Sequence, residues 1–188
     1  MKELDQLLEQ IDDRTRCWPE NAHERGLEKF VETDLFVLVL KPVRTSKPGR
    51  ELLASAIRNP DIKKRFFPEN IIDVYLVTVE PMATAGHHYH RQKIEAVFPQ
   101  DGVEIHFENI QSGEKSGLYI PERSRYFQDT TYGVIIKPGI AHAIRNPSLR
   151  HKAKYSVLSN MLEEDANRSN DIIAHQIEIN RTRLDRLP

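Results

Sequence analysis

The chain has 188 residues, of which 39% are apolar and 29% are charged. This length suits one well-packed domain and is short for two domains with separate cores. The 27 basic and 28 acidic side chains nearly cancel, which argues against nucleic acid or an anionic membrane as the partner and favours a small molecule. No apolar run approaches the roughly 20 residues that cross a bilayer, and the charged N-terminus does not resemble a signal peptide, so we expect a cytoplasmic protein.

The first 70 residues predict a mixed helical and extended segment that packs on the main domain. Its expected elements are an amphipathic helix over about 2–14, a helix over about 21–31, a buried strand over 35–40, a polar loop over 43–50, a short helix over 51–58 and a further turn near 62–66. The single cysteine, Cys17, cannot form an internal disulfide, and we interpret it as a structural thiol.

Residues 71–160 differ in composition from the first 70, because they consist of short runs rich in β-branched and aromatic residues. The runs are IIDVYLVTVEP, HHYH, IEAVF, VEIHF, GLYI, YGVIIKP and KYSVL, with Gly, Pro, Asn and Asp between them. Many short strands at near-regular spacing predict a mainly β fold, an antiparallel barrel or sandwich. The charged tail over 161–188 predicts one or two terminal helices.

The densest chemical signal lies around His88 and His90. Residues two apart on a strand point to the same face, so these two imidazoles share one side while Tyr89 and His87 point away. A turn after His90 would start an antiparallel strand that returns Glu95 to the histidines.

A fourth ligand can come from His142, which follows a Pro-Gly turn in KPGIAHAIRN. Three imidazoles and one carboxylate suit a single divalent transition metal, such as Zn, Fe, Mn, Ni or Co, and leave coordination positions open for water or substrate. His88, His90, Glu95 and His142 are therefore the predicted metal ligands, although Glu95 could instead form an ion pair with Lys93 or Arg91.

Two stretches resemble the sequence motifs of the cupin superfamily. His88-x-His90, four residues, Glu95, six residues, Gly102 resembles the first motif, and Gly139-x-x-His142-x-x-x-Asn146 resembles the core of the second. The chain departs from the pattern at Met82, where a glycine is usual, and in having its proline adjacent to Gly139. The resemblance implies a cupin-type antiparallel β-barrel, also called a double-stranded β-helix or jelly roll.

A closer resemblance is to the C-terminal cupin domain of bacterial capsular-polysaccharide enzymes that epimerise nucleotide-linked keto-sugars. It rests on GHHYHRQKIEAVF, GVEIHFENI and IIKPGIAHAIRN and covers about residues 81–160. Those enzymes usually carry a separate reductase domain, which has no counterpart in this sequence. The resemblance implies a carbohydrate substrate, and cupin barrels commonly pack sheet to sheet, so we expect a homodimer.

Three side chains are candidates for catalytic work: Glu95, Lys93 and His106. Glu95 is a ligand first and a possible base. Lys93 lies in the turn beside the ligands, where an ammonium could bind a phosphate or carboxylate, or could simply be solvated. On VEIHF the apolar residues should face the barrel interior, which leaves His106 either as a solvent-facing histidine or as an acid or base at the pocket.

Three hypotheses for function remain open. The first is a metal-dependent isomerase or epimerase acting on a carbohydrate, in which the metal polarises a carbonyl and a side chain moves the neighbouring proton. The second is a non-haem iron dioxygenase, which can use the same ligands. The third is a non-catalytic protein that binds a sugar or another metabolite.

Overall fold

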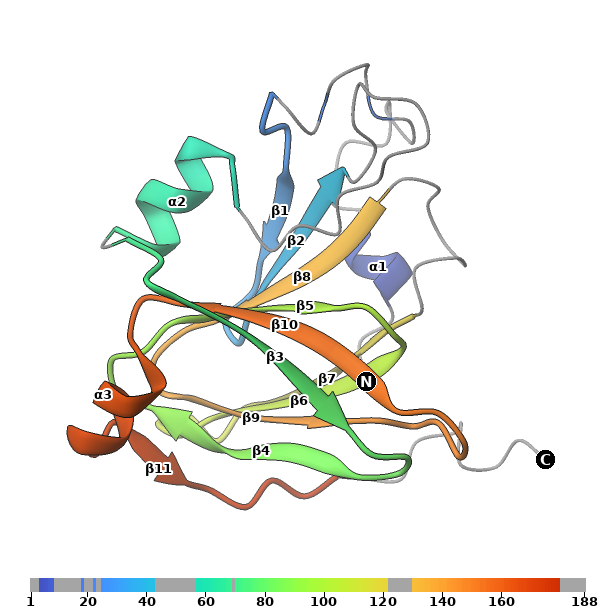
Figure 1. Cartoon of the computed structure of the whole chain (residues 1–188), viewed down its shortest axis with the longest axis vertical. Helices are drawn as coiled ribbons and strands as arrows, with labels where there is room; N and C mark the ends of the chain where they lie inside the picture. Colours follow the sequence, from blue (N-terminus) through green and yellow to red (C-terminus); the bar gives the residue numbers. More distant parts are fainter. Residues whose placement is uncertain are drawn as a thin grey trace.

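The fold consists of two antiparallel sheets that face each other (Figure 1). The structure is a computed structural model and describes residues 4–8, 18, 22, 25–42, 57–68, 70–121 and 130–179. The six-stranded sheet contains, in spatial order, β1 (Lys29–Glu32), β2 (Val37–Pro42), β8 (Thr130–Ile136), β5 (Glu95–Pro99), β10 (Ala153–Ser159) and β3 (Asp73–Val79). The five-stranded sheet contains β11 (Ile172–Ala174), β4 (Thr84–His90), β9 (Ile140–Arg145), β6 (Val103–Asn109) and β7 (Lys115–Ile120).

The main core lies between the two sheets and follows from alternation along the strands. On β2, Leu38 and Leu40 belong to this core, whereas Val37 and Val39 belong to a second cluster on the outer face of the same sheet. Successive side chains on a strand point to opposite faces, so a strand buried on both sides reads as a continuous apolar run. The predicted strand over 35–40 is confirmed as β2.

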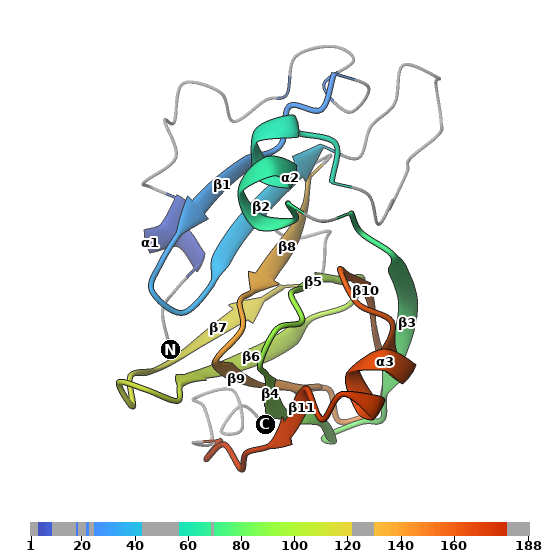
Figure 2. The same cartoon turned by 90° about the vertical axis from the view of Figure 1, so that its left-hand side faces the viewer.

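Three short helices complete the described structure: α1 (Leu4–Leu8), α2 (Pro60–Phe66) and α3 (Glu163–Arg168). Figure 2 shows α2 lying against β1 and β2, where Ile62 and Phe66 join the outer cluster. The side chain of Asn59 accepts hydrogen bonds from the backbone at the first turn of α2 and so caps this helix. Within the described ranges, no helix is long and apolar enough to span a membrane.

The structure corrects one sequence-based expectation about the helices. The helix expected over 21–31 is wrong where its end is described, because Lys29–Glu32 forms β1 and pairs with β2. The side chain of Thr33 accepts hydrogen bonds from the backbone of Leu35 and Phe36, which stabilises the turn between these strands. Of the one or two helices expected in the tail, α3 is present and is followed by the strand β11, and residues 180–188 lie outside the described part of the chain.

The sheets extend beyond the predicted core of 71–160. From the N-terminal side β2 pairs with β8, and from the C-terminal side β11 pairs with β4. β9, which was not among the predicted strands, pairs with both β4 and β6. The N-terminal segment therefore supplies strands to the fold as well as packing on it. Of the helix expected over 51–58, residues 51–56 lie outside the described residues and residues 57 and 58 are not helical. The loop over 43–50 and Cys17 also lie outside the described residues.

Asn146 fastens the end of β9 to the turn between β3 and β4. Its side chain is fully buried, and its amide nitrogen donates to the backbone oxygens of Val79, Glu80 and His151. Its side-chain oxygen accepts from the backbone of Ser148. The asparagine of the second motif therefore serves the fold rather than the ligand cluster.

We expect Asn146→Ala to lower the free energy of unfolding by about 3 kcal/mol, because several buried carbonyl groups lose their donor. Denaturant unfolding followed by circular dichroism measures this loss. Asn109→Ala is the matched control, since the side-chain oxygen of Asn109 accepts from two backbone N–H groups of an exposed turn, and we expect a cost of about 1 kcal/mol or less. Equal losses of unfolding free energy in the two variants would contradict the stabilising role of the Asn146 side chain.

Candidate metal centre

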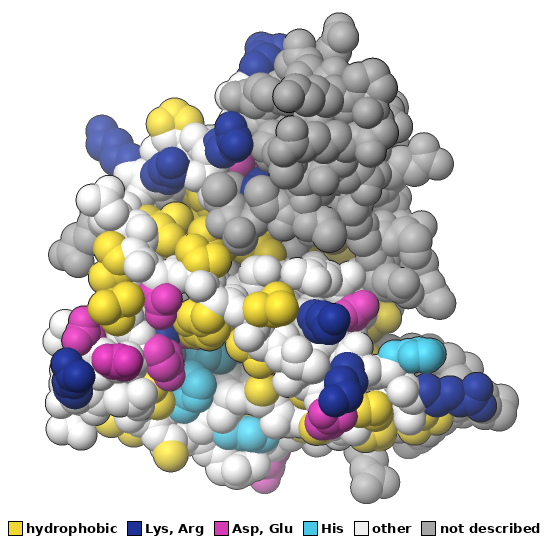
Figure 3. Space-filling view, viewed as in Figure 1, with side chains coloured by type: hydrophobic (Ala, Val, Ile, Leu, Met, Phe, Trp, Pro, Cys, Tyr) yellow, Lys and Arg dark blue, Asp and Glu magenta, His cyan; other side chains and the backbone are white. Residues whose placement is uncertain are grey.

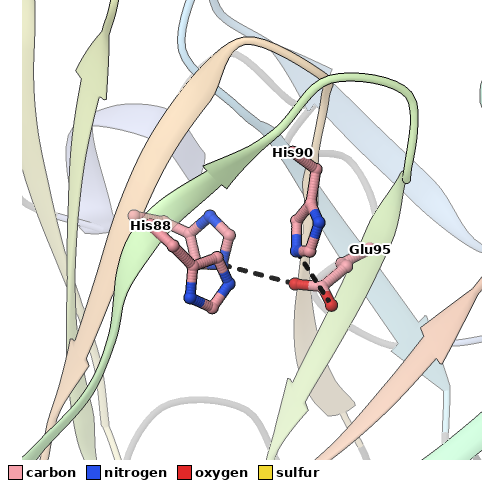
Figure 4. Close-up of side chains that lie close together, drawn as sticks. His88, His90 and Glu95 are labelled. Atoms are coloured by element: carbon pink, nitrogen blue, oxygen red, sulfur yellow. Dashed lines mark ion pairs between the residues drawn. The ribbon is translucent and has the colours of Figure 1, made fainter. Parts of the chain in front are cut away.

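Four side chains predicted as ligands meet between the two sheets. His88 and His90 come from β4, His142 comes from β9, and Glu95 comes from β5 on the opposite sheet. One nitrogen or oxygen atom of each residue lies within 4.8 Å of the corresponding atoms of the other three. Figure 4 shows the side chains of His88 and His90 lying close to the carboxylate of Glu95. Among the described residues this is the one such group of three or more His, Cys, Asp or Glu side chains.

Glu95 presents its two oxygens to different neighbours. Oε1 accepts a hydrogen bond from the Tyr75 hydroxyl at 2.7 Å and lies 3.0 Å from Lys93 Nζ and 3.5 Å from His90 Nε2. Oε2 lies 3.3 Å from His142 Nε2. Burial alone would raise the pKa of Glu95, but the neighbouring imidazoles of His142 and His90 hold it well below its ordinary value. Glu95 is therefore ionised, with Oε2 directed at His142.

His90 is held by a carboxylate from a distant part of the chain. Its Nδ1 lies 3.0 Å from Asp171 Oδ2, and Asp171 also accepts from the backbone N–H groups of Gln92 and Lys93. His90 and Asp171 are 3% and 2% exposed, so water does not weaken this contact. Because a carboxylate accepts only, the proton of a neutral His90 sits on Nδ1, and Nε2 presents its lone pair to the cluster.

His88 is the ligand candidate nearest to solvent. It is partly exposed, whereas His90, Glu95 and His142 are buried. Burial, followed by the nearby imidazoles of His142 and His90, lowers the pKa of His88 to about 4, so its ring is neutral at physiological pH. In the space-filling view of Figure 3, histidine side chains are visible in a hollow of the surface, close to acidic side chains.

Lys93 is fully buried and does not project from a turn into solvent. Its Nζ contacts Glu95 and lies 2.5 Å from Glu163 at the start of α3, and its ammonium lies 5.1 Å from the centre of the Tyr75 ring. Burial lowers the pKa of Lys93, but the two carboxylates more than compensate, so the net shift is upward. Lys93 is thus a charged group neutralised by protein carboxylates.

His106 lies on the other face of the five-stranded sheet. In the register of β6 and β9 it pairs with Ala143, whereas Phe107 pairs with His142. Paired residues of antiparallel strands share a face, so the His106 ring points away from the ligand cluster. It is buried beside Glu104, with 3.7 Å between its Nε2 and a Glu104 oxygen. The structure therefore brings Glu95 and Lys93 to the cluster but not His106.

Two residues of this site had no place in the sequence-based prediction. Tyr75 could have been found, because alternation along β3 puts it on one face with the interior residues Val77 and Val79. Asp171 follows His90 by 81 residues and matches no motif spacing, so only the folded chain brings them together.

No protein-family model and no curated protein sequence matches the chain, but solved structures do. dTDP-4-dehydrorhamnose 3,5-epimerase from Sulfolobus tokodaii is 17% identical, with a TM-score of 0.56 over 72% of this chain and 76% of that one. QdtA, a sugar 3,4-ketoisomerase from Thermoanaerobacterium thermosaccharolyticum, is 18% identical, with a TM-score of 0.52 over 73% and 88%.

The capsular polysaccharide assembling protein CapF from Staphylococcus aureus is 15% identical, with a TM-score of 0.50. The match covers 86% of this chain but only 34% of CapF, so the chain spans about a third of that protein's length. At these sequence identities the similarity establishes the fold and not the activity. The two antiparallel sheets and these neighbours confirm that the chain has a cupin-type jelly-roll fold.

Proposed function

We propose that this chain is a metal-dependent isomerase or epimerase that acts on a carbohydrate. The observation that carries the proposal is the state of His90 Nε2. This atom is buried, forms no hydrogen bond within the described part of the chain, and lies 3.5 Å from Glu95 Oε1 in the group of four candidate ligands. Since Asp171 accepts a hydrogen bond from Nδ1–H, Nε2 carries a desolvated lone pair that a cation can bind.

The donor set fits one divalent transition metal held by His88, His90, Glu95 and His142. Three imidazole nitrogens and one carboxylate oxygen match the ligand preferences of Zn, Fe, Mn, Ni or Co. The low pKa of His88 and of Glu95 keeps both in the deprotonated form that binds metal without competition from protons at neutral pH. His88, as the most exposed of the four, marks the side from which a substrate would enter.

The proposed substrate is a keto-sugar, either free or linked to a nucleotide. Its support is that the chain shares its fold with a dTDP-4-dehydrorhamnose 3,5-epimerase and a sugar 3,4-ketoisomerase. The sequence resemblance to capsular-polysaccharide epimerases points to the same class of substrate. A role in polysaccharide assembly remains a prediction. The expected homodimer is also a prediction.

Such a reaction moves a proton at the carbon beside a carbonyl. A bound divalent metal supplies Lewis-acid polarisation of that carbonyl, which lowers the pKa of the adjacent C–H. The chain contributes the surrounding charges. Glu95 is ionised, Lys93 remains protonated beside it, and burial followed by the charge of Glu95 raises the pKa of Tyr75 so that its hydroxyl keeps its proton. Tyr75 and Lys93 therefore hold Glu95 in one orientation.

Proton exchange tests the proposal. Candidate 4-keto-6-deoxy sugar nucleotides are incubated in deuterated water with the purified chain, after removal of metal by a chelator and after reloading with Zn²⁺, Mn²⁺ or Co²⁺. We expect deuterium at the carbon beside the carbonyl in the reloaded samples and at least about 100-fold slower labelling in the chelated one. Equal labelling with and without metal would remove the metal from the mechanism.

One alternative has support from a specific observation, namely proton transfer by His90 without a metal. An imidazole whose Nδ1 is held by Asp171 is arranged as a general base at Nε2. Labelling that survives chelation would favour it. The dioxygenase hypothesis requires oxygen uptake by the iron-loaded chain, and the binding-protein hypothesis requires ligand binding without labelling in any metal form.

A further inference from the structure

The interior position of the two β4 histidines depends on an irregularity in that strand. Ala83 and Ala85 pack against the core between the sheets, so residues 87 and 89 of a regular strand would also face the interior. His88 and His90 would then point outward, away from Glu95. In the structure the opposite holds, and His88 faces the interior opposite His142.

A β-bulge between Gly86 and His88 produces this change of face. Gly86 pairs with Ala143 of β9, and His88 pairs with His142, the next residue towards the start of β9, so His87 is an extra residue on β4. Both Gly86 and His87 have positive φ values, 95° and 64°. A bulge of this kind shifts the alternation by one residue, so the strand turns its even-numbered side chains inward after it.

The close approach of the two strands explains the glycine. A Cβ atom at Gly86 would lie 2.8 Å from the backbone oxygen of His142, and the backbone φ there is one that other residues rarely adopt. His87 has a side chain, so its left-handed backbone conformation costs free energy that a glycine does not lose. Something outside β4 must therefore hold His87 in place.

The C-terminal segment supplies that support through His87 itself. The backbone N–H of His175 donates to the backbone oxygen of His87 at 2.8 Å, and the backbone N–H of Ile177 donates to His87 Nδ1 at 3.3 Å. Ile177 is 3% exposed and packs with Ala141 and Ala143 on the outer face of the sheet. The segment is thus anchored on β9 while it bonds the bulge.

We propose that His87 is the positioning residue of the metal centre, holding the bulge that turns His88 and His90 toward Glu95 and His142. This inference rests on the proposed metal binding. His87 touches no ligand atom and acts through the backbone of β4. It predicts that a change at this outward-facing residue alters metal affinity even though the four ligands remain.

The test is a Co²⁺ titration of the purified full chain, read from the visible absorption of the bound ion, with Tm of the metal-free chain measured in parallel. His87→Val lacks the Nδ1 acceptor and is β-branched, so it resists a positive φ, and we expect its Kd to rise about 10- to 100-fold. His87→Asn keeps an acceptor and tolerates the left-handed region, so we expect a Kd within about 3-fold of the wild type.

Met82→Val is the matched control for backbone strain. Met82 also has a positive φ, 59°, and it lies in the turn before β4, about 20 Å along an extended chain from His88. We expect this variant to lower Tm but to leave the Kd for Co²⁺ within about 3-fold of the wild type, because the bulge is intact. If Met82→Val lost as much Co²⁺ affinity as His87→Val, the weaker binding would follow from lower stability, and the inference would be overturned.

The remaining outcomes are also decisive. A wild-type chain that binds no stoichiometric Co²⁺ would overturn the proposed metal function, and this inference with it. A wild-type chain that binds Co²⁺ while His87→Val binds it equally well would overturn the inference alone. If His87→Val does not fold, His87→Ala removes the acceptor with less backbone strain, and wild-type affinity in that variant has the same meaning.

Discussion

Glu95→Gln is expected to abolish stable metal binding and to lower the free energy of unfolding by about 3 kcal/mol. Tyr75 and Lys93 both donate toward Oε1 of Glu95, so in the variant they favour the orientation that places the amide oxygen at this position. The amide NH₂ group then faces the imidazoles, where it repels a cation instead of binding it. Loss of the carboxylate also removes one of the two charges that compensate the buried ammonium of Lys93.

The two effects are measured separately, by Co²⁺ titration and by denaturant unfolding of the metal-free chain. Glu163→Gln is the matched control, because Glu163 is the other carboxylate on Lys93 but its side chain is 50% exposed. We expect it to cost about 1 kcal/mol or less and to leave Co²⁺ affinity unchanged within about 3-fold. A Glu95→Gln chain that binds Co²⁺ like the wild type would exclude Glu95 as a ligand.

The ligand set could be predicted from sequence because its geometry is local. His88 and His90 are two apart on β4 and share a face, and Glu95 follows a short turn after His90. The expected pairing of the Glu95 strand with the histidine strand is wrong, because β5 lies in the opposite sheet and presents Glu95 to the histidines across the core. His142 required the second motif. The structure brings the four side chains together, and their role as metal ligands stays a prediction until metal binding is measured.

The support around the ligands could not be predicted, because it comes from contacts between distant segments. Strand alternation alone would have set His88 and Ala85 on opposite faces of the sheet. The bulge at His87 shifts the alternation by one residue and places both on the interior face. Lys93 looked like a turn lysine, and its burial depends on Glu163, which lies 70 residues away. The helix expected near residue 30 failed for a similar reason, since pairing with β2 outweighs local helical periodicity.

Asp171→Asn is expected to reduce turnover at subsaturating metal by about 100-fold or more, although Asp171 is not among the proposed ligands. Its Oδ1 accepts from the backbone of Gln92, and its Oδ2 receives both His90 Nδ1 and the backbone of Lys93. An asparagine can keep the first contact, but its NH₂ group then faces two N–H donors. The neutral His90 ring responds by moving its proton to Nε2, which removes the lone pair from the cluster.

This variant also separates the two mechanisms that the His90–Asp171 pair allows. With a metal mechanism, the Kd for Co²⁺ rises about 10- to 100-fold, and saturating metal restores much of the deuterium exchange. With a metal-free base at His90, exchange falls by about 10²- to 10⁴-fold and no metal concentration restores it, because the wrong nitrogen carries the proton. Asp101→Asn is the control, since Asp101 also accepts from a backbone N–H, that of Lys154, but at an exposed site. Wild-type affinity and exchange in Asp171→Asn would show that the position of the His90 proton matters to neither mechanism.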